Sequence, residues 1–344
     1  MYVINAVNVR DALPKTVQYL LIFGKIEETR GGEALVAPSP VTICYRSPKQ
    51  HVLINSLRDA NPFFHLIEAM WMLAGRDDGK FLDHYIKNFS RDFGDQYGII
   101  PDSYGHRWRY RLGFDQLKEI VEQLTDNSGS RQAVLQIWDD DLRFNGPKPC
   151  NLIVTFRIHD SRLDMAVFNR SNDLLWGCCG ANAVHFPIMQ EYIANMIGIA
   201  IGDYWQISTN LHLYMKQYMN LLERRKKITS WHDHNNDEPL WASLKNDPNY
   251  EQTEPLIKYP ESFDEELQET VCMIEDINKD LEIFDDNLSQ PFLRDTVLPM
   301  AQAHRHYKNK AIAKALAEVE KVIAADWKRA GKEWLQRRNH DKSA

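Results

Sequence analysis

The sequence contains only five cysteines, and their arrangement argues against two common structural roles. The number is odd, the spacing is irregular and no CxxC pair occurs among the 344 residues. Disulfide frameworks use even numbers of cysteines at regular spacings, and structural zinc sites use close cysteine pairs. We therefore expect reduced thiols, no bound metal and a cytoplasmic location.

Long apolar segments are also missing. No uninterrupted apolar run approaches the length of about 20 residues that spans a bilayer. The residues that follow Met1 lack the basic stretch and the apolar core of a secretory signal peptide. The expected protein is soluble and does not bind membranes.

A surplus of positive charge is absent as well. The chain has 41 lysines and arginines against 48 aspartates and glutamates, a formal net charge of -7. Proteins that coat nucleic acid carry a basic surplus, so nucleic acid binding is not expected, although a local basic pocket can hold a small anion. Basic residues gather near the C-terminus, but acidic residues lie between them, which is typical of a solvated helix face rather than an RNA-binding surface. These basic residues are Lys328, Arg329, Lys332, Arg337 and Arg338.

The alternation of apolar and polar residues predicts an α/β fold for the first two thirds of the chain. Helices are expected over residues 8–24 (with Pro14 near the start), 62–74, 114–124, 183–197 and 211–222. Strands are expected over residues 132–138, 152–158, 163–168 and 204–209, and a bent or edge strand, interrupted by prolines, over residues 34–45.

Beyond about residue 230 the composition changes. Residues 231–260 are rich in Asn, Asp, Glu and Pro and predict a long surface loop, which helices follow. In the last predicted helix, apolar residues recur at helical spacing, and such a stripe packs on its own domain more often than it binds a partner. The stripe consists of Ile312, Leu316, Val319, Ile323 and Trp327.

One cysteine has a context that suggests chemistry. Cys150 follows a loop and opens an apolar strand, a position from which a thiol can face a cavity. A lone cysteine is more often a small buried hydrophobe. Its reactivity depends on nearby positive charge, which lowers the pKa of the thiol.

Polar residues that could bind a nucleotide lie around this cysteine in the sequence. Arg170 and Ser171 end a predicted strand and together suit a phosphate dianion, or form a solvated strand end. Arg131 offers another cation at the start of a strand. Asn182 leads from a glycine-rich turn into a helix, where its amide could read a base edge or cap the helix.

In their order, these motifs resemble the thymidylate synthase family, which includes the pyrimidine hydroxymethylases. No single motif is specific, but the ordered set is, and it covers roughly residues 8–225. The matching pieces are Thr29-Arg30-Gly31-Gly32, Glu68-Ala69-Met70-Trp71-Met72-Leu73, Tyr104-Gly105-His106-Arg107-Trp108, Ser130-Arg131, Pro149-Cys150, Arg170-Ser171-Asn172-Asp173, Gly180-Ala181-Asn182 and His212-Leu213-Tyr214. The resemblance implies a catalytic domain over residues 1–230, built on a mixed twisted sheet with helices on one face and forming a homodimer through the sheet. Residues 231–344 are then a loop and a C-terminal helical extension packed on that domain.

The resemblance also implies roles for individual residues. Cys150 would attack C6 of a pyrimidine nucleoside monophosphate, which makes C5 a nucleophile for the one-carbon unit of 5,10-methylenetetrahydrofolate. Glu68 would organise water and proton transfers, and Tyr104 would assist proton removal from C5. The cationic groups around the phosphate would favour a thiolate at Cys150. The binding roles fall to Arg30, Arg170 and Ser171 for the phosphate, Arg131 for the phosphate in the other subunit, Asn182 for the base, His212 and Tyr214 for the sugar, and Asp173 and Trp71 for the folate.

The sequence departs from ordinary thymidylate synthases at several of these motifs. Gln132 stands where a second arginine is usual, and Asn151 follows the nucleophile where a histidine is usual. No tryptophan occurs around Phe89 and Ser90, where the synthases have one that keeps water from the one-carbon intermediate. The turn before Asn182 is one residue longer. The chain also continues far beyond the point where the short tail of a synthase closes over folate.

These departures bear on the product. A wetter cavity favours addition of water to the exocyclic methylene over hydride transfer from folate, so hydroxymethylation is expected. Asn182 can donate to O4 and accept from N3–H, which indicates uracil, whereas a carboxylate there suits cytosine. The expected reaction therefore converts dUMP to 5-hydroxymethyl-dUMP, a product that would suit a virus that modifies its DNA. Thymidylate synthesis and hydroxymethylation of dCMP or CMP are the alternatives. A non-catalytic nucleotide-binding protein is disfavoured because the nucleophile and the acid are both present.

Overall fold

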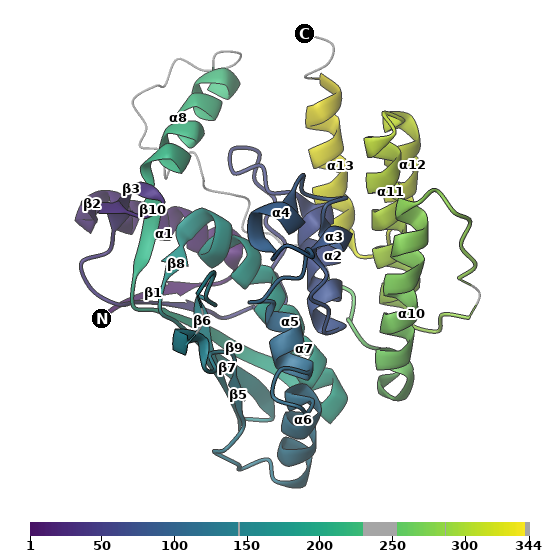
Figure 1. Ribbon diagram of the computed structural model, residues 1–344, viewed down its shortest axis with the longest axis horizontal. Helices are drawn as coiled ribbons and strands as arrows, with labels where there is room; N and C mark the ends of the chain where they lie inside the picture. Colours follow the sequence, from purple (N-terminus) through teal and green to yellow (C-terminus); the bar gives the residue numbers. More distant parts are fainter. Residues whose placement is uncertain (144, 230–252, 286, 341–344) are drawn as a thin grey trace.

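A mixed six-stranded sheet forms one side of the molecule, and the C-terminal helices lie on the opposite side (Figure 1). The computed structural model describes residues 1–143, 145–229, 253–285 and 287–340, so most of the predicted loop over 231–260 lies outside the described residues. The strands occur in the order β1 (Tyr2–Ala6), β4 (Val41–Tyr45), β9 (Ala200–Ser208), β7 (Arg162–Asn169), β6 (Asn151–His159) and β5 (Val134–Gln136). The pairs β1–β4 and β7–β9 are parallel and the others antiparallel, which confirms the predicted mixed sheet.

The hairpin of β6 and β7 shows why the sequence forms this sheet. Val154 pairs with Val167 and Phe156 with Met165, and all four side chains are buried on one face. Between these rows the side chains on the opposite face are half-buried. Residues 160 and 161 in the connecting turn have φ values of 47° and 58°, the left-handed conformation that matches the twist of a two-residue hairpin.

A second, smaller sheet lies beside the first and was not predicted. Its strands occur in the order β2 (Lys25–Thr29), β3 (Gly32–Val36), β10 (Leu211–Tyr214) and β8 (Asn172–Asp173). Two predictions are therefore wrong. Residues 34–45 form no single edge strand, because β3 and β4 belong to different sheets and β4 lies between β1 and β9. Residues 211–214 form a strand rather than the first turn of a helix, because they pair with β3 and β8, and α8 (Met215–Thr229) begins only after them.

The predicted helices of the catalytic part are present within a few residues of their expected ends. They are α1 (Val9–Phe23), which contains Pro14, α2 (Pro62–Leu73), α6 (Gln116–Asp126) and α7 (Asn182–Ile197). Three short helices, α3 (Gly79–Leu82), α4 (Phe89–Phe93) and α5 (Tyr104–Arg109), connect α2 to α6. A 3₁₀ turn (Asp141–Arg143) precedes β6, and a π-helical segment, η2 (Leu174–Ala181), leads into α7. The winding of η2 is interrupted by a kink at Cys179 and Gly180, whose φ/ψ values are not helical.

Helix α2 is buried almost throughout. Asn61 caps it by accepting bonds from the backbone N–H groups of Phe63 (3.1 Å) and Phe64 (3.2 Å), and Pro62 occupies the first position, where no hydrogen-bond donor is needed. Every residue of the helix is buried except Glu68, which is half-buried. A single carboxylate on an otherwise apolar helix points to a polar cavity at that position.

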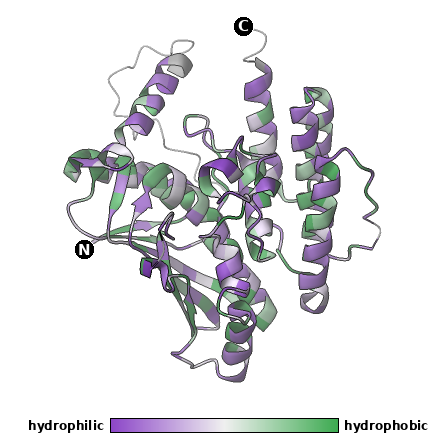
Figure 2. Ribbon diagram, viewed as in Figure 1, coloured by the Kyte–Doolittle hydropathy of each residue, from purple (hydrophilic) through white to green (hydrophobic). Residues whose placement is uncertain are grey.

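The C-terminal extension packs on the other side of α2. It consists of α10 (Pro260–Asn278), η3 (Leu293–Val297), α11 (Leu298–Lys308), α12 (Ile312–Lys321) and α13 (Ala325–His340), and Figure 2 shows mixed hydrophobic and hydrophilic surfaces along these helices. The ring of Phe63 on α2 lies 5.4 Å from that of Trp334 on α13 and 5.6 Å from that of His304 on α11. The extension therefore shares one hydrophobic core with the sheet.

The predicted stripe over residues 312–327 does not form one helix. Residues 322–324 interrupt it, since the backbone N–H of Ile323 donates to the carbonyl of Asp295 (3.0 Å) and that of Ala324 donates to Thr296 Oγ1 (3.3 Å). Val319 and Trp327 are buried as predicted, whereas Ile323 is 40% exposed. Bonds to a neighbouring helix thus override the local helical pattern.

The basic residues near the C-terminus make ion pairs. Arg337 and Arg338 both bind Asp59, at 3.2 Å and 3.0 Å, and Lys332 binds Glu320 at 2.6 Å. In the described ranges, no helix is both long enough and apolar enough to cross a membrane. The same ranges contain no group of three or more His, Cys, Asp or Glu side chains arranged to hold a metal ion.

Candidate active site

A cavity of about 230 Å³ opens to solvent between α2, α4, α5, η2 and α7. Apolar and aromatic side chains line most of it, and a few polar groups converge on one side. Seven of the residues singled out from the sequence line this cavity: Glu68, Trp71, Tyr104, Cys150, Ser171, Asp173 and Asn182. Five others do not: Arg30, Arg131, Arg170, His212 and Tyr214.

Cys150 is held at the start of β6 by its own backbone. Its N–H donates to the hydroxyl oxygen of Tyr104 (3.1 Å), and its carbonyl accepts from the N–H of Arg170 (2.9 Å). The thiol is half-buried and faces the cavity, the position expected of a nucleophile.

In the protein without ligands, Arg170 and Arg30 favour the thiolate of Cys150, in the direction predicted, but burial has the larger effect. Burial raises the pKa of the thiol above its ordinary value of 9.0, and the cations of Arg170 and Arg30 offset this only in part. The nearby carboxylate of Asp102 adds to the rise. Desolvation therefore outweighs the two arginines.

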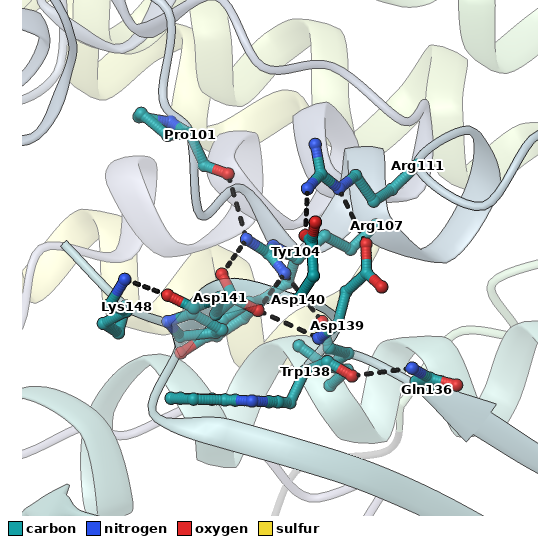
Figure 3. Close-up of polar contacts among 12 residues, drawn as sticks. Pro101, Tyr104, Arg107, Arg111, Gln136, Trp138, Asp139, Asp140, Asp141 and Lys148 are labelled. Carbon is teal, nitrogen blue, oxygen red and sulfur yellow. Dashed lines mark hydrogen bonds and ion pairs between the residues drawn. The ribbon is translucent and has the colours of Figure 1, made fainter. Parts of the chain in front are cut away.

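The loop that precedes Cys150 is clamped to helix α5 by a buried ion pair (Figure 3). Arg107 binds both carboxylate oxygens of Asp141, at 2.7 Å and 2.9 Å, and also donates to the carbonyl of Pro101 at 3.2 Å. Lys148 donates to the backbone carbonyl of Asp141. Because Arg107 lies one turn after Tyr104, this clamp fixes the thiol-bearing loop relative to the tyrosine hydroxyl.

Helices α2 and α5 approach closely enough to bring Tyr104 near Glu68. A Cβ atom at Gly105 would lie 2.1 Å from the backbone oxygen of Met72, so only glycine fits there. Burial is the largest cause that raises the pKa of Tyr104 well above 10.0, and the negative charges of Cys150 and Asp102 add to it. Tyr104 is therefore a neutral hydroxyl at physiological pH.

Glu68 faces a histidine that the sequence analysis missed. Glu68 Oε2 lies 3.2 Å from Nε2 of His185 on α7, and neither atom has a well-formed hydrogen bond within the described part of the chain. Both residues line the cavity. His185 follows Asn182 by three residues, so helical spacing from Asn182 could have identified it.

Of the predicted phosphate ligands, Ser171 lines the cavity and the three arginines do not. Arg170 is exposed, donates to the carbonyls of Pro149 (2.9 Å) and Lys148 (3.0 Å), and stacks over the ring of Trp138. Arg30 is exposed at the β2–β3 turn, but it acts electrostatically on Cys150, as Arg170 does. The structure thus places two cations close to Cys150. Arg131 is exposed and contributes nothing to the cavity of its own chain.

The predicted sugar ligands lie side by side on β10. The rings of His212 and Tyr214 are 4.9 Å apart and perpendicular, and His212 Nδ1 lies 3.0 Å from Asn210 Oδ1. Tyr214 packs against Gly31, where an added Cβ would lie 2.7 Å from the tyrosine hydroxyl. The second sheet therefore brings these two residues next to the turn that carries Arg30.

The two residues predicted to bind folate are already engaged. Asp173 caps η2 by accepting from the N–H groups of Leu175 (2.8 Å) and Trp176 (3.2 Å), and its other oxygen accepts from Gln217 (2.7 Å). Trp71 donates from its indole nitrogen to Asp78 (3.2 Å). Both side chains still line the cavity.

Of the other lining residues, only the position of Phe89 was singled out from the sequence, as a site without the usual tryptophan. Trp176 and Phe93 are 47% and 42% exposed at the cavity, and Phe89 lies in the wall beside Phe93, at a ring distance of 4.9 Å. Asp102 also lines the cavity, and burial raises the pKa of its carboxyl group. A scattered aromatic wall of this kind is recognised only once the chain is folded.

In this aromatic cavity, a half-buried thiol lies beside a tyrosine hydroxyl and a carboxylate. These groups are typical of an enzyme that forms a covalent adduct with its substrate. The thymidylate synthase family model matches residues 15–235. A deoxyuridylate hydroxymethyltransferase from Pseudomonas phage M6 is 37% identical over 350 residues, which cover 98% of this chain and 95% of that protein. The chain belongs to the thymidylate synthase family, and it is a one-carbon transferase.

Two further relatives cover only part of the chain. A deoxyuridylate hydroxymethyltransferase from Bacillus phage SP01 is 34% identical over 201 residues, or 54% of this chain and 52% of that protein. A putative thymidylate synthase from Methanothermobacter thermautotrophicus is 26% identical over 218 residues, or 62% of this chain and 93% of that protein. The C-terminal extension lies beyond the family model and is shared with the relative from phage M6.

Proposed function

We propose that this protein transfers a one-carbon unit from 5,10-methylenetetrahydrofolate to C5 of dUMP, and that water completes the reaction to give 5-hydroxymethyl-dUMP. The observation that carries the proposal is the match, over 98% of the chain, to a relative named for deoxyuridylate hydroxymethylation. The thiol-lined cavity supports it, because it provides the nucleophile that such chemistry requires. The phage sources of two relatives fit a reaction in the cytoplasm of an infected cell.

Cys150 begins the proposed reaction. The thiol gives up its proton to water in the open cavity as its sulfur bonds to C6 of uracil, and the electron pair displaced from the C5–C6 double bond makes C5 the nucleophile that captures the one-carbon unit, whose bond to one folate nitrogen breaks. A water held by the neutral hydroxyl of Tyr104 then takes the C5 proton. The folate amine departs with its bonding pair, so that an exocyclic methylene remains on C5. Water adds to this methylene, the C5–C6 double bond re-forms, and Cys150 is expelled as a thiolate.

Glu68 and His185 are the residues proposed to hold the attacking water. Both residues line the cavity, and their atoms Glu68 Oε2 and His185 Nε2 are buried without a hydrogen-bond partner among the described residues. Buried polar atoms of this kind normally have a partner, which a water or a substrate atom would supply. From this position Glu68 can accept a proton from the water as its oxygen attacks the methylene.

The cavity suits a flat folate ring. Trp71, Phe89, Phe93 and Trp176 provide aromatic walls against which a pterin can stack, and Asp173 lies among them. The folate supplies the one-carbon unit when it is bound. No tryptophan occurs around Phe89 and Ser90, where synthases have one that keeps water from the one-carbon intermediate, and this absence supports a wetter cavity and a hydroxymethyl product.

The phosphate and the sugar of the nucleotide are assigned to residues predicted from the sequence, most of which lie outside the cavity lining. Arg30, Arg170 and Ser171 would bind the phosphate, and His212 and Tyr214 the sugar hydroxyl. Arg131 would reach the phosphate of a partner subunit in a homodimer. The outer face of the main sheet supports such a dimer, because Thr155, Ala166 and Trp205 form a row of half-buried side chains across three strands.

Product analysis tests this proposal. Purified protein with dUMP and methylenetetrahydrofolate should yield a nucleotide heavier by one formaldehyde equivalent, together with tetrahydrofolate. A methylated nucleotide with dihydrofolate would instead show a thymidylate synthase. Turnover of dCMP in place of dUMP would show a cytidylate hydroxymethylase. Cys150→Ala is the control, and it should form neither product.

Asn182 is the residue proposed to read the base. Asn182→Asp should shift the preference from dUMP toward dCMP, because a protonated carboxyl group can donate to N3 of cytosine and accept from its amino group. Relative kcat/KM for the two nucleotides measures this shift. An unchanged preference would show that Asn182 does not contact the base.

A further inference from the structure

A row of buried amide side chains leads from the cavity into the core. Asn151 Nδ2 donates to Asn182 Oδ1 (3.2 Å), and Asn182 Nδ2 donates to Asn172 Oδ1 (3.2 Å). Asn172 Nδ2 donates to Gln206 Oε1 (2.6 Å), and Gln206 Nε2 donates to the backbone carbonyl of Cys178 (3.0 Å). We call these four residues, Asn151, Asn182, Asn172 and Gln206, the amide relay.

The geometry points to a specificity role: Asn172 and Gln206 fix the orientation of the Asn182 amide, so that the enzyme accepts uracil and rejects cytosine. This inference rests on the proposed function, in which Asn182 contacts the base. Asn172 and Gln206 would act as positioning residues, because they work through Asn182.

The backbone carbonyl of Cys178 gives the relay its direction. A carbonyl oxygen can only accept, so Gln206 must turn its NH₂ group toward Cys178 and its oxygen toward Asn172. Asn172 must then donate to Gln206, which leaves its own oxygen facing Asn182. Asn182 in turn must present its NH₂ group to Asn172 and its oxygen to Asn151. Reversing any one amide would bring two oxygens or two NH₂ groups together.

Burial makes such a reversal costly. Asn151 and Gln206 have no exposed surface, and Asn172 and Asn182 are 2% and 7% exposed. An unpaired polar atom at such positions loses its hydrogen bonds to water without compensation. Both donor hydrogens of Asn172 are in use, because its NH₂ group also donates to Ser208 Oγ (3.0 Å). The hydroxyl of Ser208 can donate or accept, so it stabilises the relay without setting its direction.

The fixed orientation matches one base. Asn182 Oδ1 keeps one lone pair for N3–H of uracil, and Asn182 Nδ2 keeps one hydrogen for O4. Cytosine presents an acceptor at N3 and a donor at its amino group, so it meets a like group at each position. An amide that was free to turn would bind either base, and the relay removes that freedom.

A glycine leaves room for the relay. A Cβ atom at Gly177 would lie 2.7 Å from Asn172 Oδ1 and 3.5 Å from Asn182 Nδ2, the two atoms that bond to each other. Any side chain at this position would push on that bond.

The test compares two variants that each remove a bond that fixes the orientation of the amides with one variant that removes a bond that does not. Asn172→Leu removes the acceptor that holds Asn182, and Gln206→Met removes the link to the Cys178 carbonyl at a residue that does not itself line the cavity. Ser208→Ala is the matched control, because it removes only the bond without direction. The readout is the ratio of kcat/KM for dUMP to that for dCMP in the full-length protein, with the melting temperature of each variant measured alongside.

We expect the ratio to fall about tenfold in Asn172→Leu, the size of one lost hydrogen bond, and to fall by a smaller factor in Gln206→Met. The change should appear mainly in KM, because Cys150 and Glu68 are untouched. Ser208→Ala should keep the ratio of the parent protein. If Asn172→Leu does not fold, the ratio measured for Gln206→Met tests the inference by itself.

Equal losses with both nucleotides in Asn172→Leu and Gln206→Met would overturn the inference, since they would indicate a purely structural role. An unchanged ratio would overturn it as well. Asn182→Asp separates this failure from failure of the proposed function. If Asn182→Asp shifts the base preference but Asn172→Leu leaves the ratio unchanged, only the role of the amide relay is refuted. If Asn182→Asp causes no shift, the proposed contact between Asn182 and the base is refuted.

Discussion

The thiol of Cys150 is buried enough that its own desolvation opposes ionisation, although Arg170 and Arg30 lie close by. Its reactivity therefore depends on how much positive charge the surroundings provide once the site is filled. A phosphate dianion bound by the same arginines would offset their positive charge and favour the neutral thiol. The sequence indicates the cations around Cys150 but not this balance, because the desolvation of a thiol depends on the packed environment.

Alkylation of Cys150 should report this balance. The pKa of the thiol lies above 9.0, so its reaction with iodoacetamide should keep accelerating as the pH rises past 9.0. Arg170→Leu should raise the pKa of the Cys150 thiol further, because the charge of Arg170 lowers it. The modification rate of the Cys150 peptide is followed by mass spectrometry. A plateau below pH 9 in the parent protein would contradict the assignment.

The Arg107–Asp141 pair should be a large contributor to stability. Its side chains are 4% and 7% exposed, so Asp141→Ala leaves a buried, unpaired arginine and should lower the free energy of unfolding by about 3–5 kcal/mol. Asp140→Ala removes only the partly exposed pair with Arg111 and should cost about 0–1 kcal/mol. Urea unfolding measures both variants, and equal effects would show that burial does not govern this pair.

The same pair should affect the acid limit of stability. Burial raises the pKa of Asp141, but the hydrogen bonds from Arg107 and from the Asp139 backbone lower it by more, so the net pKa lies below 3.8. The pair therefore contributes to the free energy of unfolding at neutral pH, and this contribution is lost only as the pH falls through the lowered pKa of Asp141. The stability difference between the parent and Asp141→Ala should shrink below pH 3.8.

At the scale of elements, prediction succeeded where a local pattern decides the structure. α2, α7 and the β6–β7 hairpin follow from caps, apolar spacing and a two-residue turn. It failed where distant partners decide. Residues 211–214 became β10 because β3 and β8 supply the hydrogen bonds, and His185 and Asn172 entered the site because α7 and β8 converge on the cavity.

Helix α10 is connected to the cavity wall by a chain of polar contacts. Glu275 on α10 binds Arg76, Arg76 binds Asp78 at 2.6 Å, and Asp78 accepts from the indole of Trp71. Glu275→Ala should raise the KM for methylenetetrahydrofolate about threefold, a loss of ~0.6 kcal/mol typical of a partly exposed pair. Glu269→Ala, at an exposed position of the same helix, is the control. Identical KM values for both variants would exclude this connection.

Considered as a whole, the molecule has one core rather than a catalytic domain with a detachable appendage. Phe63 on α2 lies against Trp334 and His304 of the extension, and Tyr85 stacks on His304 at 4.6 Å. The sequence predicted that the extension packs on the catalytic part, but the partner helix could not be predicted, because apolar spacing identifies a buried face without naming what covers it.

Trp334→Ala should therefore destabilise the whole chain. Truncating a buried tryptophan costs about 3–5 kcal/mol, and the loss should appear in the catalytic part as well as in the extension. Activity and helical circular dichroism, followed through the same urea titration, should decline together in parent and variant. Separate transitions, with activity surviving the first, would show that residues 231–344 fold as an independent unit.

The central claim is that Cys150 activates dUMP and that water, rather than hydride, reaches the captured one-carbon unit. The most direct measurement is the mass of the nucleotide formed from dUMP and methylenetetrahydrofolate in water labelled with oxygen-18. The account predicts a 5-hydroxymethyl product that carries the heavy oxygen, and no product from Cys150→Ala. A methylated product without the label would contradict it, and so would product formation by the variant that lacks the thiol.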